Sequence, residues 1–343
     1  MAPRNAIPNL AGKVICDGQI TLHETLGQGS FGRVFRGETA DKTSFAVKLM
    51  AQHTPGSPRA LAQAKEQALH LDMGEHPNIV TLHAAESDSD FVYIVMENCP
   101  GGDLYGHMTK KSFIGDTDGV KNIFGQVMDA VHYCHEQGVY HRDLKPDNIL
   151  MSKDGAHAYL GDFGLSTTST SSMHTVGTKH YESPECLQAS SLHRSYEHAP
   201  NDVWALGVIL CSMISSCRPW DAADDTDPYF ATFRQDPRWL YDTLPISEEA
   251  FKLLCDIFTL DPRFRVTLPE LKERVAGMKT FFRDMEEDGL APVVAIVVDV
   301  VLMRDMSDLE EVAIPFNWDY VRRKPKWRER VGAKLGNLFA RLR

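Results

Sequence analysis

Two short motifs in the middle of the chain have the residue types and spacing that phosphoryl chemistry needs. The first is His141-Arg142-Asp143-Leu144-Lys145-Pro146-Asp147-Asn148. Asp143 can accept the proton of a hydroxyl group, Lys145 can neutralise a phosphate, and the amide of Asn148 can bind magnesium. Fourteen residues further on, Asp162-Phe163-Gly164 adds a carboxylate, the ligand that a hard cation prefers. The two motifs in this order indicate transfer of a phosphoryl group to a hydroxyl.

A glycine-rich run and a lysine lie upstream and could hold the phosphoryl donor. The run is Gly27-Gln28-Gly29-Ser30-Phe31-Gly32-Arg33-Val34, between two strand-like segments. Glycines let a hairpin backbone lie directly over a triphosphate. A strand follows the run, whereas a dinucleotide-binding fold requires a helix there. Lys48 could hold the phosphates if a carboxylate orients it, and Glu66 is the candidate for that carboxylate.

These residues need two kinds of elements to position them. Short β-rich runs are expected at 20–26, 34–38, 45–50 and 91–96, with one helix at 60–73 between the third and the fourth. After Pro100-Gly101-Gly102, apolar residues at helical spacing predict helices at 117–137, 202–215 and 247–259. The predicted fold class is therefore α+β, with a small β-rich lobe followed by a larger, mainly α-helical one.

The order of these motifs resembles that of the eukaryotic protein kinase family, over residues 18–283. Ser183-Pro184-Glu185 stands where the family usually has Ala-Pro-Glu. The resemblance implies the bilobal protein kinase fold, with an N-lobe at about 18–97 and a C-lobe at about 98–283. It also implies an enzyme that uses ATP and Mg²⁺ to phosphorylate protein substrates in signalling.

The resemblance implies a serine/threonine kinase, because Lys145 follows His-Arg-Asp-Leu where tyrosine kinases usually carry Ala-Ala-Arg. Asp143 is then the catalytic base, and Lys145 steadies the phosphoryl group in transfer. Thr178 matches the family position that contacts both of them.

Other family roles fall on residues of both lobes. Lys48 and Glu66 would form the activating ion pair, and Asn148 and Asp162 would bind magnesium. Asp202 resembles the buried aspartate that braces the catalytic loop. Glu185 and Arg265 would form a buried ion pair.

The resemblance also outlines a nucleotide pocket. Met96 would be the gatekeeper, Glu97 and Cys99 would present backbone groups to adenine, and Asp103 would lie near the ribose. The residues expected to line this pocket are Leu26, Gly27, Gln28, Gly29, Ser30, Phe31, Gly32, Arg33, Val34, Ala46, Lys48, Met96, Glu97, Cys99 and Asp103.

Two other functions are weighed against an active kinase. A pseudokinase or scaffold module would bind nucleotide and partners without turnover, but it would lack at least one of Lys48, Asp143, Asn148 or Asp162. A small-molecule phosphotransferase of related fold is disfavoured by the complete segment Gly177–Glu185.

Several short segments are similar to fungal kinases that restrain meiosis or respond to nutrients. The segments are Glu66–His70, His76–His83, Asp227-Pro228-Tyr229-Phe230, Leu244-Pro245-Ile246-Ser247 and Thr267-Leu268-Pro269-Glu270-Leu271. This resemblance concerns biological role and is a weaker inference than the chemistry.

A run of serine and threonine at 166–172 suggests a site of control. A phosphate on Ser172 or Thr175 could pair with Arg142 and order the segment. Position 167, where relatives often have a second basic residue, is Thr167. The alternative is a flexible polar loop.

The net charge of −11 disfavours a general nucleic-acid binder. It is unevenly distributed, since residues 321–343 carry nine Lys/Arg and one Glu, a net +8 that leaves −19 for the rest. Residues 1–17 are expected to be a loose lead-in, and residues 284–343 a C-terminal extension that ends in this basic, amphipathic tail. Three interpretations of the tail stay open: docking on the kinase's own acidic body, binding to an anionic membrane or an import receptor, and a pseudosubstrate at Arg328-x-Arg330-x-x-Ala333. Asp103 and Asp147 suggest basic peptide substrates.

Seven scattered cysteines without a C-x-x-C pair indicate reduced thiols, hence cytoplasm or nucleus. The most apolar stretch, 291–303, is interrupted by Asp299 and too short to span a bilayer, so no transmembrane segment is expected.

Overall fold

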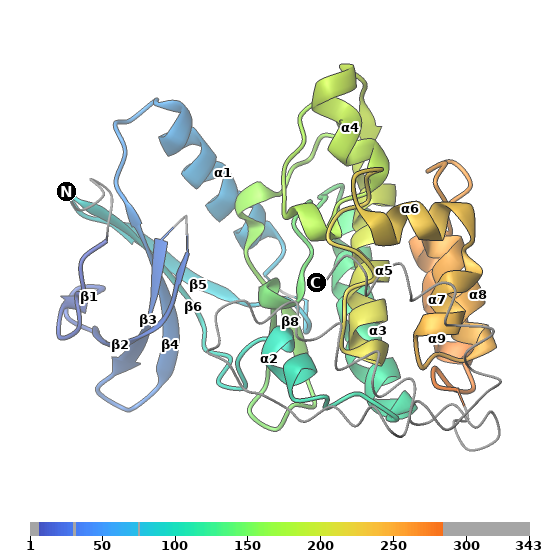
Figure 1. Ribbon diagram of the computed structural model, residues 1–343. Coiled ribbons are helices and arrows are strands. Elements are labelled where there is room, and N and C mark those ends of the chain that lie inside the picture. The colour runs from blue at the N-terminus through green and yellow to red at the C-terminus, as the bar shows by residue number, and fades with distance from the viewer. Residues whose placement is uncertain (1–6, 30–31, 75, 284–343) are drawn as a thin grey trace, which may run out of the picture. The chain divides into compact units, whose positions relative to one another are not determined.

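The computed structural model describes residues 7–29, 32–74 and 76–283 (Figure 1). A β-rich part with helix α1 comes first along the chain, and a part built mainly of helices follows it. The predicted α+β class is thus confirmed. Ser30, Phe31 and the whole C-terminal extension, with its basic tail, lie outside the described residues.

The β-rich part is one antiparallel sheet in the order β1-β2-β3-β4-β6-β5. Its strands are β1 (Val14–Ile15), β2 (Ile20–Gly29), β3 (Gly32–Thr39), β4 (Ser44–Ala51), β5 (Leu82–Ser87) and β6 (Phe91–Glu97). Leu22, Phe35 and Val47 are fully buried on one side of this sheet and form its core. Lys48, the next residue after Val47 on β4, therefore points to the opposite face.

The expected loose lead-in at 1–17 needs correction near its end. β1 pairs with β2, and the backbone of Gly12 and Lys13 exchanges hydrogen bonds with Leu22 at 2.7 and 2.8 Å. Ile15 is buried in the sheet core. The apolar pair Val14–Ile15 is too short to show period-two alternation, so the sequence pattern did not reveal it.

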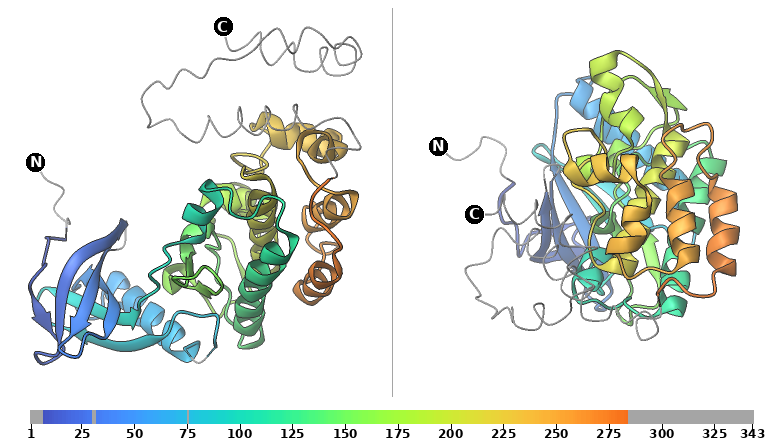
Figure 2. Two further views of the ribbon diagram at one scale, coloured as in Figure 1. Left: turned by 90° about the horizontal axis from the view of Figure 1, so that it is seen from below. Right: turned by 45° about the vertical axis from the view of Figure 1, so that its right-hand side comes forward.

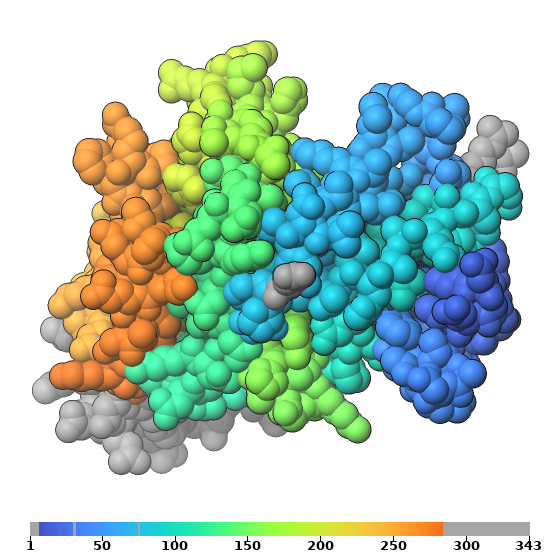
Figure 3. Space-filling view, turned by 180° about the vertical axis from the view of Figure 1, so that it is seen from behind, coloured from blue at the N-terminus to red at the C-terminus, as the bar shows by residue number. Residues whose placement is uncertain are grey.

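Helix α1 (Pro58–Asp72) begins at a capped end. The hydroxyl of Ser57 accepts a hydrogen bond from the backbone N–H of Ala60, and Pro58 occupies the first turn. Glu66, Leu69 and His70 are its buried residues. One face of α1 therefore carries Glu66 inward, while the helix lies at the surface of the molecule in Figure 3. On its outer face Leu61 and Leu71 are each 61% exposed.

The helical part surrounds one long buried helix. Its elements are α2 (Leu104–Thr109), α3 (Thr117–Glu136), α4 (Pro184–Leu192), α5 (His198–Ser215), α6 (Pro228–Gln235), α7 (Arg238–Thr243), α8 (Glu248–Ile257) and α9 (Leu268–Gly277), with short pairs β7 (Ile149–Met151)/β8 (Ala158–Leu160) and β9 (Ser171–Ser172)/β10 (Tyr196–Glu197). Helix α5 contacts both α3 and α8, and α3 contacts α9, as the side-by-side helices of Figure 2 show.

Trp204 of α5 sits in an aromatic cluster with Trp220, Phe230 and Phe258, at centroid distances of 5.8, 6.2 and 5.0 Å. Nearly every residue of α5 is buried. The predicted start at 202 is four residues late, because His198 and the polar pair Asn201–Asp202 are buried too and do not look like a core helix in the sequence.

Backbone hydrogen bonds join the β-rich part to the helical part close to Asp162 in the sequence. Val80 donates to the carbonyl of Leu160 at 2.9 Å, and Leu160 donates to the carbonyl of Asn78 at 2.8 Å. Strand β8 is thereby fixed to the segment that leads from α1 into β5. Asp162, two residues after Leu160, is held against the β-rich part by the same contact.

The ion pair between Glu185 and Arg265 supplies a first test. Arg265 donates to the two Glu185 oxygens at 2.5 and 3.1 Å, and its guanidinium lies 4.9 Å from the Trp204 ring. Glu185→Ala leaves the buried Arg265 cation without its carboxylate. We expect the free energy of unfolding to fall by about 3–5 kcal/mol, measured by urea unfolding.

The control is Glu248→Ala, which removes an exposed pair with Arg238 at 3.4 Å. A surface pair of this kind contributes about 0–1 kcal/mol. Equal losses in the two variants would contradict the structural role given to Glu185.

Candidate active site

A buried carboxylate on α5 binds the backbone of the turn at His141-Arg142-Asp143. Asp202 accepts the backbone N–H groups of His141 and Arg142 at 3.0 and 2.9 Å, and the ring of His135 at 2.9 Å. Burial raises the pKa of Asp202, but these hydrogen bonds outweigh burial and the pKa is lowered. Arg142 has φ of 64°, a conformation that a non-glycine residue keeps only when its surroundings enforce it. The carboxylate of Asp202 supplies that enforcement.

Asp143, Lys145 and Thr178 form a closed triangle. Lys145 Nζ donates to Asp143 Oδ2 at 2.9 Å and to Thr178 Oγ1 at 3.0 Å, while the Thr178 hydroxyl donates to Asp143 Oδ1 at 2.7 Å. Asp143 is 9% exposed, at the edge of the solvent. The structure thus brings together three residues that are 35 positions apart at most, with a carboxylate oriented by two donors.

Asn148 fits a metal ligand. Its Nδ2 donates to the Asp143 carbonyl at 2.8 Å and to Asp143 Oδ2 at 3.3 Å. Because the amide nitrogen faces Asp143, the amide oxygen points the other way, as an oxygen ligand must. In the described part of the chain no group of three or more His, Cys, Asp or Glu gathers as a metal site would. Magnesium commonly takes one or two protein oxygens and completes its shell with phosphates and water.

Lys48 joins the sheet to both α1 and the Asp-Phe-Gly segment. Its Nζ lies 2.7 Å from Glu66 Oε1 and 2.9 Å from Asp162 Oδ1. Burial lowers the pKa of Lys48, but the two carboxylates outweigh burial and the pKa is raised. Asp162 is the converse case, since burial raises its pKa but Lys48 outweighs burial and the pKa is lowered. Lys48 and Asp162 are therefore both charged at neutral pH.

Three rings pack against one another near this ion pair, and the sequence analysis gave no role to one of them, His70. The ring of Phe163 lies 5.0 Å from that of His70 and 5.3 Å from that of His141. His70 Nε2 also lies 2.7 Å from the Val80 carbonyl oxygen. His70 is one helical turn after Glu66, so the i, i+4 spacing on α1 was the available signal. These ring contacts hold α1, which carries Glu66, against Phe163.

The glycine run forms the β2–β3 hairpin. Gly27 pairs with Val34 and Gly29 with Gly32. A Cβ on Gly27 or Gly29 would meet nothing within 4 Å, whereas one on Gly32 would lie 2.2 Å from the Leu49 carbonyl oxygen. The third glycine is thus required by strand β4 itself, and the first two face open space.

The other predicted pocket residues lie on strands β2, β4 and β6 and on the segment after β6. Ala46 is paired with Met96 in the sheet, and Leu26 is 49% exposed on β2. The N–H of Glu97 donates to the Thr81 carbonyl at 2.9 Å. Asp103 caps α2 by accepting from the Gly106 N–H at 2.8 Å, a structural task that the sequence analysis did not foresee.

Ser172 and Thr175, the predicted phosphorylation sites, are held by different contacts. Ser172 is in β9, which pairs with β10, and Thr175 donates to the Cys186 carbonyl at 2.7 Å. Arg142 Nε donates to the Leu165 carbonyl at 2.8 Å. Lys65 of α1, whose pKa is lowered by burial and by Arg142, donates to Thr167 at 3.3 Å. Phosphorylation of Ser172 or Thr175 stays a prediction.

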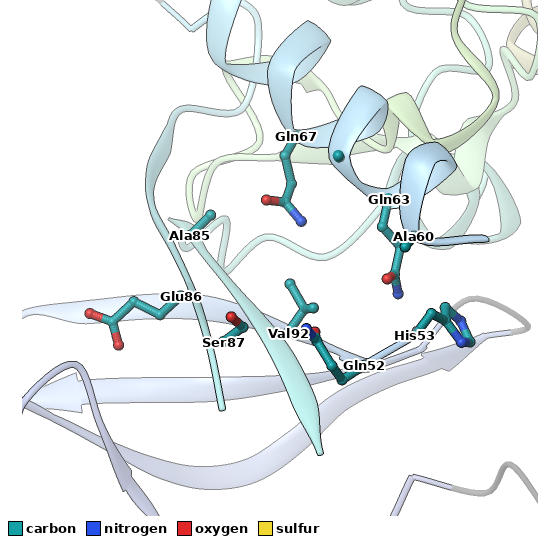
Figure 4. A pocket seen from close by; sticks show the side chains of 10 residues that line it. Gln52, His53, Ala60, Gln63, Gln67, Ala85, Glu86, Ser87 and Val92 are labelled. Atoms are coloured by element: carbon teal, nitrogen blue, oxygen red, sulfur yellow. The ribbon is translucent and has the colours of Figure 1, made fainter. Parts of the chain in front are cut away.

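A separate cavity of about 230 Å³ lies between α1 and strands β5 and β6. Figure 4 shows Gln63 and Gln67 of α1 facing Val92 across it. None of the residues predicted to contact ATP, magnesium or the acceptor hydroxyl lines this cavity. Among the described residues no helix is long and apolar enough to cross a membrane.

The brace under the turn can be tested by Asp202→Asn. The amide is neutral and has one acceptor oxygen in place of two, so one of the backbone amides of His141 and Arg142 loses its acceptor and neither keeps a charged partner. We expect a loss of about 3 kcal/mol in unfolding free energy, because hydrogen bonds to charged groups contribute about 1.5–3 kcal/mol each. Faster hydrogen exchange at these two amides is the matching local readout.

The exposed Asp118 of α3 offers the control Asp118→Asn, for which neither stability nor exchange at His141 should change. Unaltered exchange in Asp202→Asn would refute the brace.

The protein kinase domain family matches residues 20–275. The chain is 38% identical over 296 residues to "Negative regulator of sexual conjugation and meiosis" of Schizosaccharomyces pombe, covering 80% of this chain and 63% of that protein. It is 34% identical over 237 residues to serine/threonine-protein kinase VHS1 of Saccharomyces cerevisiae (65% and 51%), and 32% identical over 301 residues to CBL-interacting serine/threonine-protein kinase 17 of Arabidopsis thaliana (85% and 67%).

The chain spans about half to two thirds of the length of these relatives. The family match covers the hairpin, the Lys48 ion pair, the catalytic turn and the buried helix α5 together. The chain belongs to the protein kinase family.

Proposed function

We propose that this protein is an active serine/threonine kinase that transfers the γ-phosphoryl group of Mg-ATP to hydroxyls of protein substrates. The observation that carries the proposal is the triangle of Asp143, Lys145 and Thr178. A carboxylate with two donors on its oxygens is oriented before any substrate arrives. Such positioning supplies most of the catalysis in phosphoryl transfer, where the transition state is loose.

In this mechanism the protein holds two reactants in line. Asp143 accepts the proton of the acceptor hydroxyl as the bond to phosphorus forms. The ammonium of Lys145, which already lies beside Asp143, is placed to neutralise charge on the transferring group. Magnesium, when bound through Asn148 and Asp162, would neutralise charge on the phosphate oxygens.

Lys48 is the residue through which the lobes cooperate. It would hold the α- and β-phosphates, and Glu66 fixes its position. Because Lys48 also contacts Asp162 at 2.9 Å, a displacement of α1 would disturb both the phosphate contact and the metal ligand.

The acceptor is assigned to Ser and Thr on the Lys145–Thr178 contact at 3.0 Å, which occupies the space beside Asp143. Two of the similar proteins are named serine/threonine-protein kinases, which supports the same assignment. The exposed Asp147 lies two residues after Lys145, and Asp103 forms a bridge with Leu150 of β7. Their charge favours acceptor peptides with basic residues, which we infer as the substrate class.

The pseudokinase alternative has no support in the geometry. Lys48, Asp143, Asn148 and Asp162 are all present, and each makes the contacts that an active site needs. A scaffold would have no use for an oriented carboxylate of this kind.

Asp143→Asn tests the function itself. We expect kcat to fall at least about 100-fold, because an amide cannot take the hydroxyl proton. Transfer of radiolabelled phosphate from ATP with Mg²⁺ would be measured on basic Ser, Thr and Tyr peptides. Asp118→Asn serves as the matched control. Equal incorporation by wild type and Asp143→Asn would sink the kinase assignment, and preference for the Tyr peptide would sink the acceptor assignment.

Substitution of Thr178 tests the orientation of Asp143 separately from its role as the base. Thr178→Val keeps the shape but removes the hydroxyl, so we expect a 10- to 150-fold drop in kcat, the equivalent of about 1.5–3 kcal/mol for a hydrogen bond to a charged group. Thr178→Ser retains the hydroxyl and should keep most of the rate. Identical kcat values for the two variants would show that the hydroxyl does not orient Asp143.

A further inference from the structure

Glu182 is a buried carboxyl that none of the roles above uses. It follows the short helix η3 (Lys179–Tyr181), four residues after Thr178, and only 3% of it is exposed. Its Oε2 accepts a hydrogen bond from the thiol of Cys186 on α4. Its Oε1 has no hydrogen-bond partner among the described residues. A buried carboxyl oxygen without a donor is costly, so its state needs an explanation.

The position of Gly177 shows what lies opposite this oxygen. A Cβ added to Gly177 would lie 2.2 Å from Glu182 Oε1 and 2.4 Å from the carbonyl oxygen of Arg142. Both oxygens therefore lie beside the same point in space. Gly177 has φ of 112°, which suits glycine, and its missing side chain leaves room for both oxygens.

A carbonyl oxygen and an ionised carboxylate oxygen are both acceptors, so they repel each other when they are close together and buried. A proton on the carboxyl turns that repulsion into a hydrogen bond. A cavity of only about 10 Å³ lies beside Glu182, lined by Asp143, Thr178 and Asn201 among others. It is at the lower limit for one water molecule and offers an ionised carboxylate little solvation.

The charges around Glu182 point to the same state. Burial has the largest effect, and Asp143 of the catalytic loop and Asp202 of α5 act with it to raise the pKa. The Cys186 thiol of α4 and the guanidinium of Arg142 act against it, and the pKa rises to about 7. Tyr196 of β10 also lies close enough to feel this charge.

We propose that Glu182 is a neutral carboxylic acid in the active enzyme and that it donates a hydrogen bond to the main-chain carbonyl of Arg142. This bond ties the substrate-side segment, which carries Thr178, to the turn that carries Asp143. Glu182 is thus a positioning residue and touches no reacting atom. The proposal deepens the function proposed above, and rests on it only for the effect on rate.

The bond makes the fold sensitive to pH in a defined direction. A carboxyl whose pKa is raised on folding contributes stability that is complete below its unfolded pKa, about 4.3, and is lost as pH rises through its folded pKa. Between about pH 4.3 and about pH 7 the unfolding equilibrium constant should therefore increase by up to about tenfold per pH unit through this group, and above about pH 7, where the carboxyl is ionised in both states, it should change no further.

The test is Glu182→Gln, whose amide N–H can donate to the Arg142 carbonyl at every pH. Unfolding by urea between about pH 4 and 8.5, at about half-unit steps, compares it with wild type. The difference between the two proteins should shift in favour of Glu182→Gln by up to about tenfold per unit between about pH 4.5 and 7, and should stay constant above about pH 7.5. The exposed Glu197→Gln on neighbouring β10 is the matched control and should follow wild type.

Infrared difference spectra provide a readout that needs neither activity nor unfolding. The stretching band of a neutral carboxylic acid should be present in wild type and Glu197→Gln at pH 6, and absent in Glu182→Gln. Peptide kinetics complete the set: at pH 8, kcat of Glu182→Gln should equal or exceed that of wild type, with KM for ATP unchanged.

Two results would overturn the proposal. One is a stability difference between Glu182→Gln and wild type that does not change with pH. The other is the absence of the acid band at pH 6, which would mean that Glu182 is ionised and that a water or a cation occupies its surroundings. Because unfolding and infrared spectra require no phosphoryl transfer, a failed kinase assay would leave this test valid.

Discussion

The carboxylate of Asp202 is the contact on which the rest of the site depends. A buried charge is costly, and here its cost is offset by two backbone amides and a histidine ring. Those amides belong to the residues just before Asp143, so the direction of the catalytic carboxylate follows from the position of α5. Helix α5 is in turn immobilised by burial along nearly its whole length. The hydrophobic core of the helical part thus determines the position of the polar side chain of Asp143.

The β-rich part reaches the same site by a different principle. Its contribution is one ammonium, Lys48, which is shared between a helix and a loop. The ring of Phe163 also contacts those of His70 and His141, tilted to the first and edge-on to the second. The ion pair and the ring contacts together connect α1, which carries Glu66, to the segments that carry Asp162 and His141.

Sequence reasoning succeeded where chemistry dictates residue type and order. The order of the motifs that contain Asp143, Lys145, Asn148 and Asp162 predicted the fold class, and the family match over residues 20–275 confirms it. It was weaker where tertiary contacts decide. The strand at Val14–Ile15 exists only because β2 lies beside it, and the first turn of α5 is polar in sequence but buried in the fold. Glu182 follows an ordinary-looking tyrosine, and only the approach of Gly177 and Arg142 shows that its environment is unusual.

The glycine hairpin shows that one motif can be under two independent constraints. Strand β4 excludes any side chain at Gly32, whereas the space over Gly27 and Gly29 is restricted only by what binds there. A related protein that no longer bound a nucleotide could accept other residues at Gly27 and Gly29 but would still require glycine at position 32. The pattern of decay in such a lineage would therefore reveal which function had been abandoned, long before the fold itself changed.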